Sequence, residues 1–191
     1  MAPPLLTVGH GRLDRDELAA LLTGAGVERL VDVRRFPGSR TNDAAARGHI
    51  EEICESAGIA YRWEEQLGGR RRLTKDQDAA SPDTWWRVAA FRAYAAWTRE
   101  DEFRAAVRDL VADIAVARTA VMCSESVWWR CHRRIIADVV ALEHGTEVQH
   151  LMHTGDLRVH EPSDGARLED GHIVWDGAAE AEGTPASGAD A

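Results

Sequence analysis

The sequence predicts an α/β fold: a single doubly wound, mostly parallel sheet of about five strands flanked by helices, Rossmann-like or flavodoxin-like. Two observations predict it. Short apolar runs alternate with amphipathic helical patterns over residues 5–152, as in strands joined by helical crossovers. The length of 191 residues suits one domain with a sizeable core. We therefore expect one domain over residues 1–176, with a small β appendage near its C-terminal end.

The first half of the chain contains three apolar runs that are predicted strands: residues 5–9, 29–33 and 59–63. After the first strand, Asp14 is a predicted N-cap with Glu17 as its capping-box partner, and Gly26 ends this helix. A second helix is predicted to end near Ala57. Its apolar face includes Cys54, which we therefore expect to be a small core residue.

The second half continues the alternation. Residues 70–82 are polar and are expected to form a mobile loop, followed by helices at about 83–97 and 100–117. Next come a strand at 119–122, a helix whose apolar stripe begins at Ile135, and a fifth strand over 147–152. Residues 155–176 are predicted to form the hairpin-like appendage. Residues 177–191, rich in Ala, Gly, Glu and Ser, are expected to be a disordered acidic tail.

The net charge of −9 is unevenly distributed. Residues 161–191 contain eight acids and one base, whereas residues 1–160 contain 24 acids and 22 bases. The body is therefore nearly neutral, which argues against tight non-specific binding of a nucleic-acid duplex. Its basic charge is almost entirely arginine, since Lys75 is the single lysine. Arginine binds carboxylate and phosphate in a bidentate way, so the places where arginines gather matter most.

Arginines recur in the loops at one predicted edge of the sheet. The C-terminal ends of parallel strands meet at the same edge, so the loops that follow them share a site. Four such loops bring arginine there, and helix N-termini add partial positive charge, which predicts an anionic ligand. The candidate anion-binding or substrate-binding residues are His10, Arg34, Arg35, Arg40, Gly69, Arg130 and Arg133.

The turn after the strand at 119–122 carries the side chains with the most chemistry. The candidate catalytic residues there are Cys123, Glu125, Cys131 and His132. A thiol at a helix N-terminus beside arginine has a lowered pKa and is partly thiolate at neutral pH. Cys123, at the strand end, is the first choice for the nucleophile. Arg130 and Arg133 would hold the anion, and Arg34 and His10 would complete the site from neighbouring loops.

Two other mechanisms remain open for this turn. Zinc or iron could be bound, the candidate ligands being Cys123, Cys131, His132 and His10. Consecutive helical residues point about 100° apart, which weighs against Cys131 and His132 holding one ion. Alternatively, Glu125 could act as nucleophile or general base on an N-glycosidic bond. Arginines would then hold a nucleotide phosphate, and a base would stack on Trp63, Trp128 or Trp129.

Structural interpretations stand beside these functional ones. Arg34 could pair with Asp32, and Glu125 could pair with Arg130 or Arg133. The joint placement of all these residues at one edge is what favours a site.

Several short motifs together resemble one protein family. They are Val8–His10, Val31–Arg40, Gly58–Tyr61, Leu67–Gly69, Met122–Glu125 and Cys131–Arg133. In their order and spacing, over roughly residues 5–175, they resemble the domain-of-unknown-function 488 family. The resemblance implies a small, cytoplasmic, mostly bacterial α/β protein with a shared site at these motifs and with no settled activity.

These observations predict a cytoplasmic enzyme, a transferase or hydrolase, that acts on a phosphorylated, nucleotide or nucleic-acid-derived substrate. The N-terminus lacks a secretory signal, no apolar stretch is long enough to span a membrane, and three cysteines indicate a reducing compartment. We expect an anionic small molecule or nucleic-acid component as partner, and no membrane. The alternatives are a protein that binds zinc or iron, and a non-catalytic nucleotide-binding or nucleic-acid-binding module.

Overall fold

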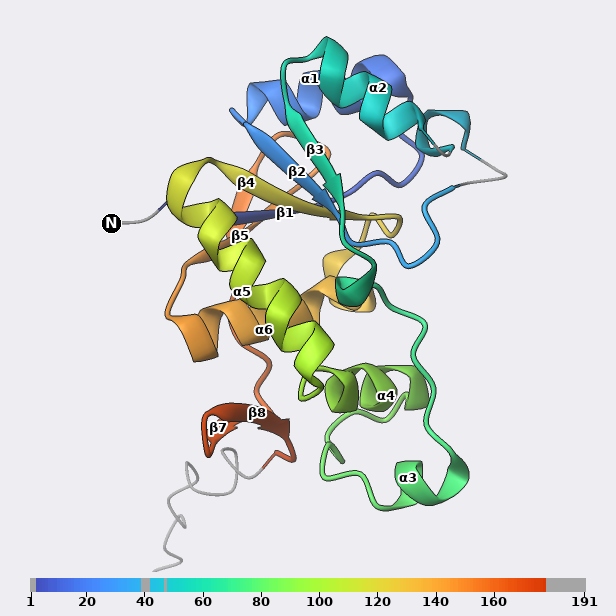
Figure 1. Ribbon diagram of the computed structural model, residues 1–191, viewed down its shortest axis with the longest axis vertical. Coiled ribbons are helices and arrows are strands. Elements are labelled where there is room, and N and C mark those ends of the chain that lie inside the picture. The colour runs from blue at the N-terminus through green and yellow to red at the C-terminus, as the bar shows by residue number, and fades with distance from the viewer. Residues whose placement is uncertain (1–2, 39–41, 47, 178–191) are drawn as a thin grey trace, which may run out of the picture.

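The computed structural model describes residues 3–38, 42–46 and 48–177. Two predictions lie outside these residues: the anion-binding role of Arg40, and the acidic tail from residue 178 onward. The described residues build an α/β fold with a mostly parallel sheet between two layers of helices, which confirms the predicted fold class (Figure 1). None of the described helices is long and apolar enough to cross a membrane.

A six-stranded sheet forms the middle layer. Its strand order is β3 (Ala60–Trp63), β2 (Arg29–Asp32), β4 (Thr119–Cys123), β1 (Leu5–Gly9), β5 (Val148–Leu151) and β6 (Leu157–Val159). The first five are parallel and correspond to the five predicted strands. The sixth, β6, pairs antiparallel with β5, whereas the sequence places it in the appendage. This strand has only three residues, all exposed, which is too short for an apolar run that would mark it as part of the main sheet.

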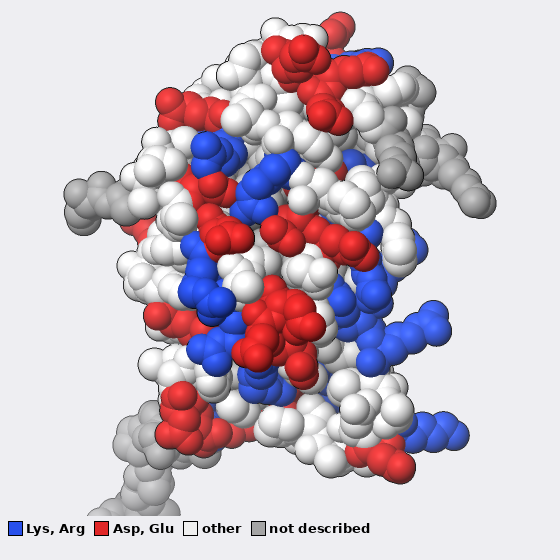
Figure 2. Space-filling model, in the orientation of Figure 1, with Lys and Arg blue, Asp and Glu red and all other residues white. Residues whose placement is uncertain are grey.

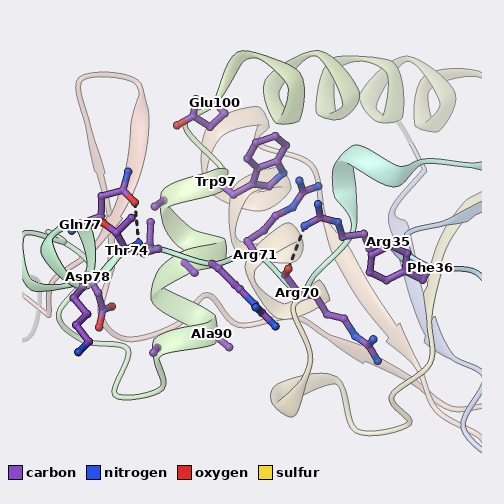
Figure 3. Close-up of a pocket in the computed structure, with 16 residues that line it drawn as sticks. Arg35, Phe36, Arg70, Arg71, Thr74, Gln77, Asp78, Ala90, Trp97 and Glu100 are labelled. Atoms are coloured by element: carbon purple, nitrogen blue, oxygen red, sulfur yellow. Dashed lines mark hydrogen bonds between the residues drawn. The ribbon is translucent and has the colours of Figure 1, made fainter.

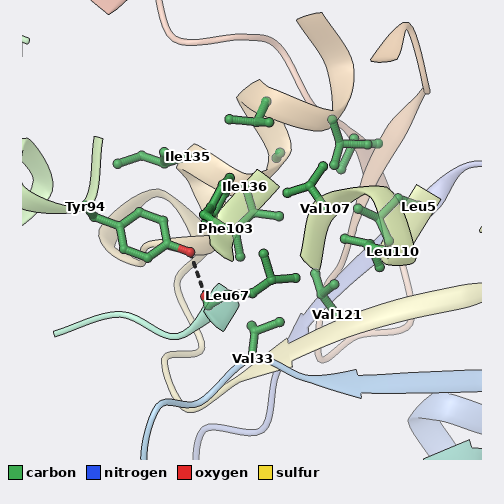
Figure 4. Packing of buried hydrophobic residues seen from close by; sticks show 14 of the residues in the cluster. Leu5, Val33, Leu67, Tyr94, Phe103, Val107, Leu110, Val121, Ile135 and Ile136 are labelled. Atoms are coloured by element: carbon green, nitrogen blue, oxygen red, sulfur yellow. Dashed lines mark hydrogen bonds between the residues drawn. The ribbon is translucent and has the colours of Figure 1, made fainter. Parts of the chain in front are cut away.

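Helices cover both faces of this sheet. On one face lie α1 (Arg15–Gly24) and α2 (His49–Ser56), and on the other lie α5 (Asp101–Val116) and α6 (Arg133–His144) (Figure 1). Successive strand residues point to opposite faces, so Met122 joins the core beneath α1 and α2 and Cys123 joins the core beneath α5 and α6. Figure 4 shows the latter core, which strands, helices and the short 3₁₀ helix at Leu67 share.

The predicted helix starts are only partly correct. The Asp14–Glu17 capping box of α1 is confirmed. The expected loop over 70–82 contains a short helix, α3 (Lys75–Ala79), and the helix expected at 83–97 begins later, as α4 (Ala89–Trp97). The delay has a cause: the buried Asp83 carboxylate pairs with Arg99 and accepts from the Trp175 backbone N–H. These contacts hold the segment before α4 in a non-helical turn.

The C-terminal appendage is a two-stranded hairpin of β7 (Ala166–Glu169) and β8 (His172–Trp175). It is fastened to the middle of α6 by buried hydrogen bonds. The carboxylate of Asp138 on α6 accepts from Trp175 Nε1 at 2.8 Å, and from the hydroxyl of Ser163 at 2.8 Å. The hairpin therefore steadies α6, whose first residue is Arg133 and which follows Cys131 closely in the chain.

Candidate functional site

The C-terminal ends of β1, β2 and β4 lie side by side and meet the start of α6. The backbone N–H of His10, just after β1, donates to the carbonyl of Cys123 at 3.0 Å. No residue larger than glycine fits at position 9, because a Cβ on Gly9 would collide with the carbonyl oxygen of Glu125 and the guanidinium of Arg133. The glycine at the end of β1 therefore lets the loop after β4 and the first turn of α6 close together.

Two thiols meet at this junction. The short 3₁₀ helix η3 (Trp128–Arg130) turns the chain back, so that Cys131 lies beside Cys123 with the two sulfur atoms 2.7 Å apart. Both cysteines are buried and free. Cys54 is buried as well, as predicted for a small core residue, and it lies in the core on the other face of the sheet.

Arg133 lies against the thiol pair and is buried without a carboxylate partner among the described residues. Its side chain is 2% exposed. Nη1 donates to Cys123 Sγ at 2.9 Å and Nη2 donates to the carbonyl of Ser126 at 2.9 Å. Arginine remains charged in proteins, and a buried charge without a counter-charge is strongly unfavourable. The thiol pair is the group placed to balance this charge, which favours one thiolate.

The two cysteines differ in how readily they ionise. Burial alone would raise the pKa of Cys131, but a hydrogen bond from Cys123, the charge of Arg133 and the Arg133 backbone N–H together lower it. The pKa of Cys123 is raised well above its usual value by burial and by its position beside the Cys131 sulfur. Cys131 is therefore the more readily ionised of the two thiols, a difference in pKa that the sequence alone does not reveal.

His132 lies beside Cys131 with a defined tautomer. Its Nε2 is 3.1 Å from the carbonyl oxygen of Val33, which can only accept, so the proton sits on Nε2. The unprotonated Nδ1 then faces Cys131 Sγ at 3.5 Å. Burial lowers the pKa of His132, which keeps the ring neutral. Gly69 allows this arrangement, because a Cβ there would come within 2.9 Å of His132 Nδ1.

A pocket of about 360 Å³ opens over the thiol pair. All four candidate catalytic residues line it, together with Gly69 and Arg130 of the anion-binding candidates. Its lining is Gly69, Arg70, Val88, Ala90, Phe91, Tyr94, Cys123, Ser124, Glu125, Arg130, Cys131 and His132. Glu125 and Arg130 are exposed, and the structure shows no ion pair between them or between Glu125 and Arg133. The pocket thus combines a buried pair of thiols with an accessible carboxylate and guanidinium.

Two other candidates lie near the pocket without lining it. Arg34 is 6% exposed, and its guanidinium is held by Asp32 through Nε at 2.9 Å and Nη2 at 2.6 Å. Its Nη1 donates to the carbonyl of Ala45, so the structural interpretation fits this residue. His10 is buried as well, and burial followed by the charge of Arg34 lowers its pKa. Its Nε2 has no hydrogen-bond partner in the described structure.

A larger hollow of about 1210 Å³ adjoins this pocket and shares Arg70 and Ala90 with it. It includes Arg35, the remaining candidate, and lies between the segment after β3 and α4 (Figure 3). We call it the arginine cleft. Its lining is Arg35, Phe36, Arg70, Arg71, Arg72, Leu73, Thr74, Lys75, Gln77, Asp78, Ala89, Ala90, Ala93, Ala96, Trp97 and Glu100. The consecutive arginines after Gly69 are its sequence signal, whereas Trp97 and Ala96 come from a helix that gives no such signal.

The tryptophans expected to stack a base have other partners or stand apart. Trp128 stacks on His150 with ring centroids 3.9 Å apart, and Trp63 donates from Nε1 to the carbonyl of Arg34 at 2.7 Å. Trp129 is exposed but lines neither hollow.

Sequence reasoning also missed a buried relay of hydrogen bonds that runs from Thr7 through His150 and His160 to Asp138. These four residues lie on four separate segments, so no local pattern could reveal it.

The geometry gives no support to the metal alternative. In the described part of the chain, no group of three or more His, Cys, Asp or Glu side chains is arranged to hold a metal ion. The pair of sulfurs instead contacts a guanidinium, which is a cation itself.

The topology and site define a doubly wound α/β protein with a thiol pocket at the carboxyl edge of its sheet. Comparison with known families gives the particular assignment: the chain belongs to the family described as "Domain of unknown function DUF488", whose model matches residues 14–140. This confirms the resemblance, over a shorter stretch than the motifs suggest. No curated protein and no solved structure matches the chain.

Proposed function

We propose that this protein is an enzyme that uses Cys131 as a nucleophilic thiolate on an anionic substrate. The observation that carries the proposal is Arg133, a buried guanidinium whose described partners are a sulfur and a backbone carbonyl. A structural arginine at this edge, Arg34, has a carboxylate instead. A charge balanced by thiols supports a thiolate maintained for chemistry.

Four pocket residues have roles in this proposal. Cys131 attacks the electrophilic atom of the substrate, and Cys123 donates a hydrogen bond that holds the thiolate before attack. The neutral Nδ1 of His132 accepts the thiol proton when Cys131 is protonated. Glu125, exposed at the rim, is the general acid or base for the leaving group or water. Cys131 thus replaces Cys123, the residue that strand position alone favours.

The substrate class follows from the charge around the pocket opening. Arg130 and Arg70 both line the pocket, and both side chains are exposed and without an acidic partner in the described structure. Such groups bind phosphate or carboxylate oxygens in a bidentate way. We infer a phosphorylated, nucleotide or nucleic-acid-derived substrate. A reduced thiol pair also fits the cytoplasm, where we place the protein.

The thiolate is tested by the rate at which iodoacetamide alkylates each cysteine as a function of pH, with peptide mass spectrometry as the readout. Cys131 should react with a midpoint below about 8.5, the value of an ordinary thiol. Arg133→Met should move this midpoint upward by about one unit or more, because the charge that stabilises the thiolate is gone. Arg134→Met is the matched control, since Arg134 stacks near Trp85 and Trp86 and does not contact a thiol.

Cys54 supplies an internal reference in the same experiment, because burial raises the pKa of its thiol to about 12. If Cys131 reacts no faster than Cys54 at neutral pH, the thiolate and the mechanism built on it are wrong.

Turnover is tested with a panel of nucleotides and 5′-phosphorylated oligonucleotides, followed by mass spectrometry of the products. Cys131→Ser should abolish any conversion and leave ligand affinity within about twofold, because serine retains the size of the side chain but is not ionised. The second candidate function is a binding module without catalysis, which the size of the arginine cleft favours. Binding without conversion by the wild-type chain, unaffected by Cys131→Ser, would establish the module instead.

A further inference from the structure

The arginine cleft is larger than a pocket for a single small molecule. Its volume of about 1210 Å³ exceeds the range of about 300–1,000 Å³ of small-molecule sites. The thiol pocket, at about 360 Å³, lies within that range. Because the two hollows share Arg70 and Ala90, a ligand that fills both would be an extended molecule with one end at the thiols.

The charge of the cleft is strongly positive. Five cationic residues line it: Arg35, Arg70, Arg71, Arg72 and Lys75. Two acids line it as well, but Asp78 is already held by Arg92 through two hydrogen bonds of 2.7 Å. The side chains of Arg70, Arg72 and Lys75 make no hydrogen bond or ion pair with any described residue. These cations are therefore free to bind an anion.

Arg70 is held in a strained backbone conformation between the two hollows. Its φ is 60°, in the left-handed region that non-glycine residues seldom occupy. The carbonyl of Arg70 accepts from Arg35 Nη1 at 3.1 Å, which helps to fix this conformation. Figure 3 shows the Arg70 side chain extending away from Arg35 and Arg71. Strain of this kind concentrates at ligand-binding sites, where the position of one side chain matters.

Flat groups are interleaved with these cations. Phe36 is 62% exposed and lines the cleft directly after Arg35. The guanidinium of Arg71 lies 3.7 Å above the Trp97 ring, so it presents a fixed, planar cation (Figure 3). Aromatic rings and guanidinium planes are the surfaces on which unpaired bases stack, whereas an inorganic polyanion has no use for them.

We propose that the arginine cleft binds single-stranded nucleic acid. The backbone phosphates lie along Arg70, Arg72 and Lys75, and the bases stack on Phe36 and on the Arg71 plane. The end of the strand reaches the thiol pocket, a placement that rests on the proposed function. A duplex needs a broader basic surface, whereas Figure 2 shows acidic side chains mixed with basic ones over much of the visible face.

The experiment is fluorescence anisotropy with a labelled single-stranded oligonucleotide of about ten nucleotides, titrated with the full-length protein at several salt concentrations. The test variant is Arg70→Gly/Arg72→Ala, in which glycine suits the left-handed backbone at position 70. It should weaken binding at least tenfold and reduce the magnitude of the slope of log K against log salt by about 1.4. The matched control is Arg108→Ala/Arg158→Ala, which removes two exposed arginines outside the cleft and should change affinity less than twofold.

Stacking is tested separately with Phe36→Ala, which should weaken binding about tenfold without changing the salt slope. Equal losses in the test and control double variants would overturn the site. Equal affinity for a duplex would overturn the single-strand assignment. So would full displacement of the oligonucleotide by polyphosphate together with an affinity of the Phe36→Ala variant equal to that of the wild type. Thermal melting of each variant shows whether it folds, and Phe36→Ala carries the test alone if the double variant does not.

These outcomes are distinguishable from failure of the proposed function. If the protein binds the oligonucleotide but Cys131 reacts slowly, the proposal for the cleft stands and the thiol mechanism is wrong. If Cys131 reacts fast but the protein binds no oligonucleotide, the thiol mechanism stands and the proposal for the cleft is wrong. Protection of Cys131 from alkylation by the bound oligonucleotide would place the strand end in the thiol pocket, and unchanged alkylation would exclude that placement.

Discussion

Arg34, after β2, and Arg133, at the start of α6, are both buried at the same edge of the sheet, yet their charges are balanced in different ways. Arg34 makes a bidentate ion pair with Asp32, which also accepts from the hydroxyl of Tyr61. Arg133 contacts Cys123 Sγ and one carbonyl. A carboxylate is ionised at any physiological pH, whereas a thiol is ionised only if its surroundings favour it.

This difference indicates which arginine is structural. The Arg34–Asp32 pair is permanent and holds the loop after β2 through the carbonyl of Ala45. The Arg133–thiol contact supplies a counter-charge only while one sulfur is ionised, and protonation, oxidation or substrate attack at sulfur removes it. A buried arginine whose counter-charge can be removed is suited to chemistry.

The largest expected effect concerns stability. Asp32→Asn should reduce the free energy of unfolding by about 3–5 kcal/mol, because Arg34 is left buried and uncompensated. Arg133→Met should change it by less than about 1.5 kcal/mol, because the thiols simply keep their protons and methionine fills much of the space. Urea denaturation monitored by tryptophan fluorescence measures both.

The control for this comparison is the double variant Asp32→Asn/Arg34→Met, which removes both charges and should recover part of the lost stability. An Arg133→Met variant as unstable as Asp32→Asn would mean that Arg133 is structural too.

A second prediction extends the contrast to buried histidines. His160 contacts the Asp138 carboxylate at 2.8 Å, whereas His150 lies between His160 and Thr7 with no acid of its own. Burial, followed by the charge of His160, lowers the pKa of His150 to about 3. Between about pH 6.5 and 3 the unfolded chain therefore binds a proton at His150 that the folded chain does not. Stability should fall as the pH is lowered, by about 2–3 kcal/mol at pH ~4.5 from this residue.

His150→Gln tests the assignment, because glutamine does not titrate. Its free energy of unfolding should be lower at neutral pH but should depend less steeply on pH between about 6.5 and 4.5. Parallel pH curves for the variant and the wild type would show that another group causes the acid sensitivity.

The smallest effect concerns oxidation of the thiol pair. A small-molecule disulfide such as oxidised glutathione should link Cys123 to Cys131, the two thiols giving up two protons and two electrons as glutathione disulfide is reduced to two thiols. Arg133 stabilises the reduced thiolate, so Arg133→Met should shift the equilibrium toward the protein disulfide, about tenfold for each unit by which the Cys131 pKa rises. Thiol trapping at fixed glutathione ratios measures this shift.

Cys54 is again the internal control and should remain a free thiol, since it lies on the other face of the sheet. A mixed disulfide with glutathione that persists at Cys131 would show that the two sulfurs cannot approach to bonding distance.

The fold was predictable because its signals are local. Each parallel strand is a short apolar run, and the start of α1 is marked by Asp14 and Glu17. The convergence of Cys123, Glu125, Cys131 and His132 on one pocket follows from topology, since a strand end and the next helix start share an edge.

What the sequence could not predict depends on contacts between distant segments. The late start of α4 depends on Asp83 meeting Arg99 and Trp175, and no local pattern reports that contact. Which of the two thiols ionises more readily depends on two contacts of the Cys131 sulfur. It accepts a hydrogen bond from Cys123 and another from the backbone N–H of Arg133. The confinement of Arg34 depends on Ala45, eleven positions away in the chain.

The family match over residues 14–140 has a practical consequence for anyone who prepares a fragment of this protein. The matched residues do not include β1, which lies between β4 and β5 in the sheet, and they do not include β5. Nor do they include Ser163 and Trp175, which hydrogen-bond to Asp138 of α6. A fragment cut to the matched residues would expose the edge of β4 along its whole length and would release the helix that carries Arg133. Expression boundaries should therefore include β1, β5 and the hairpin as far as Trp175.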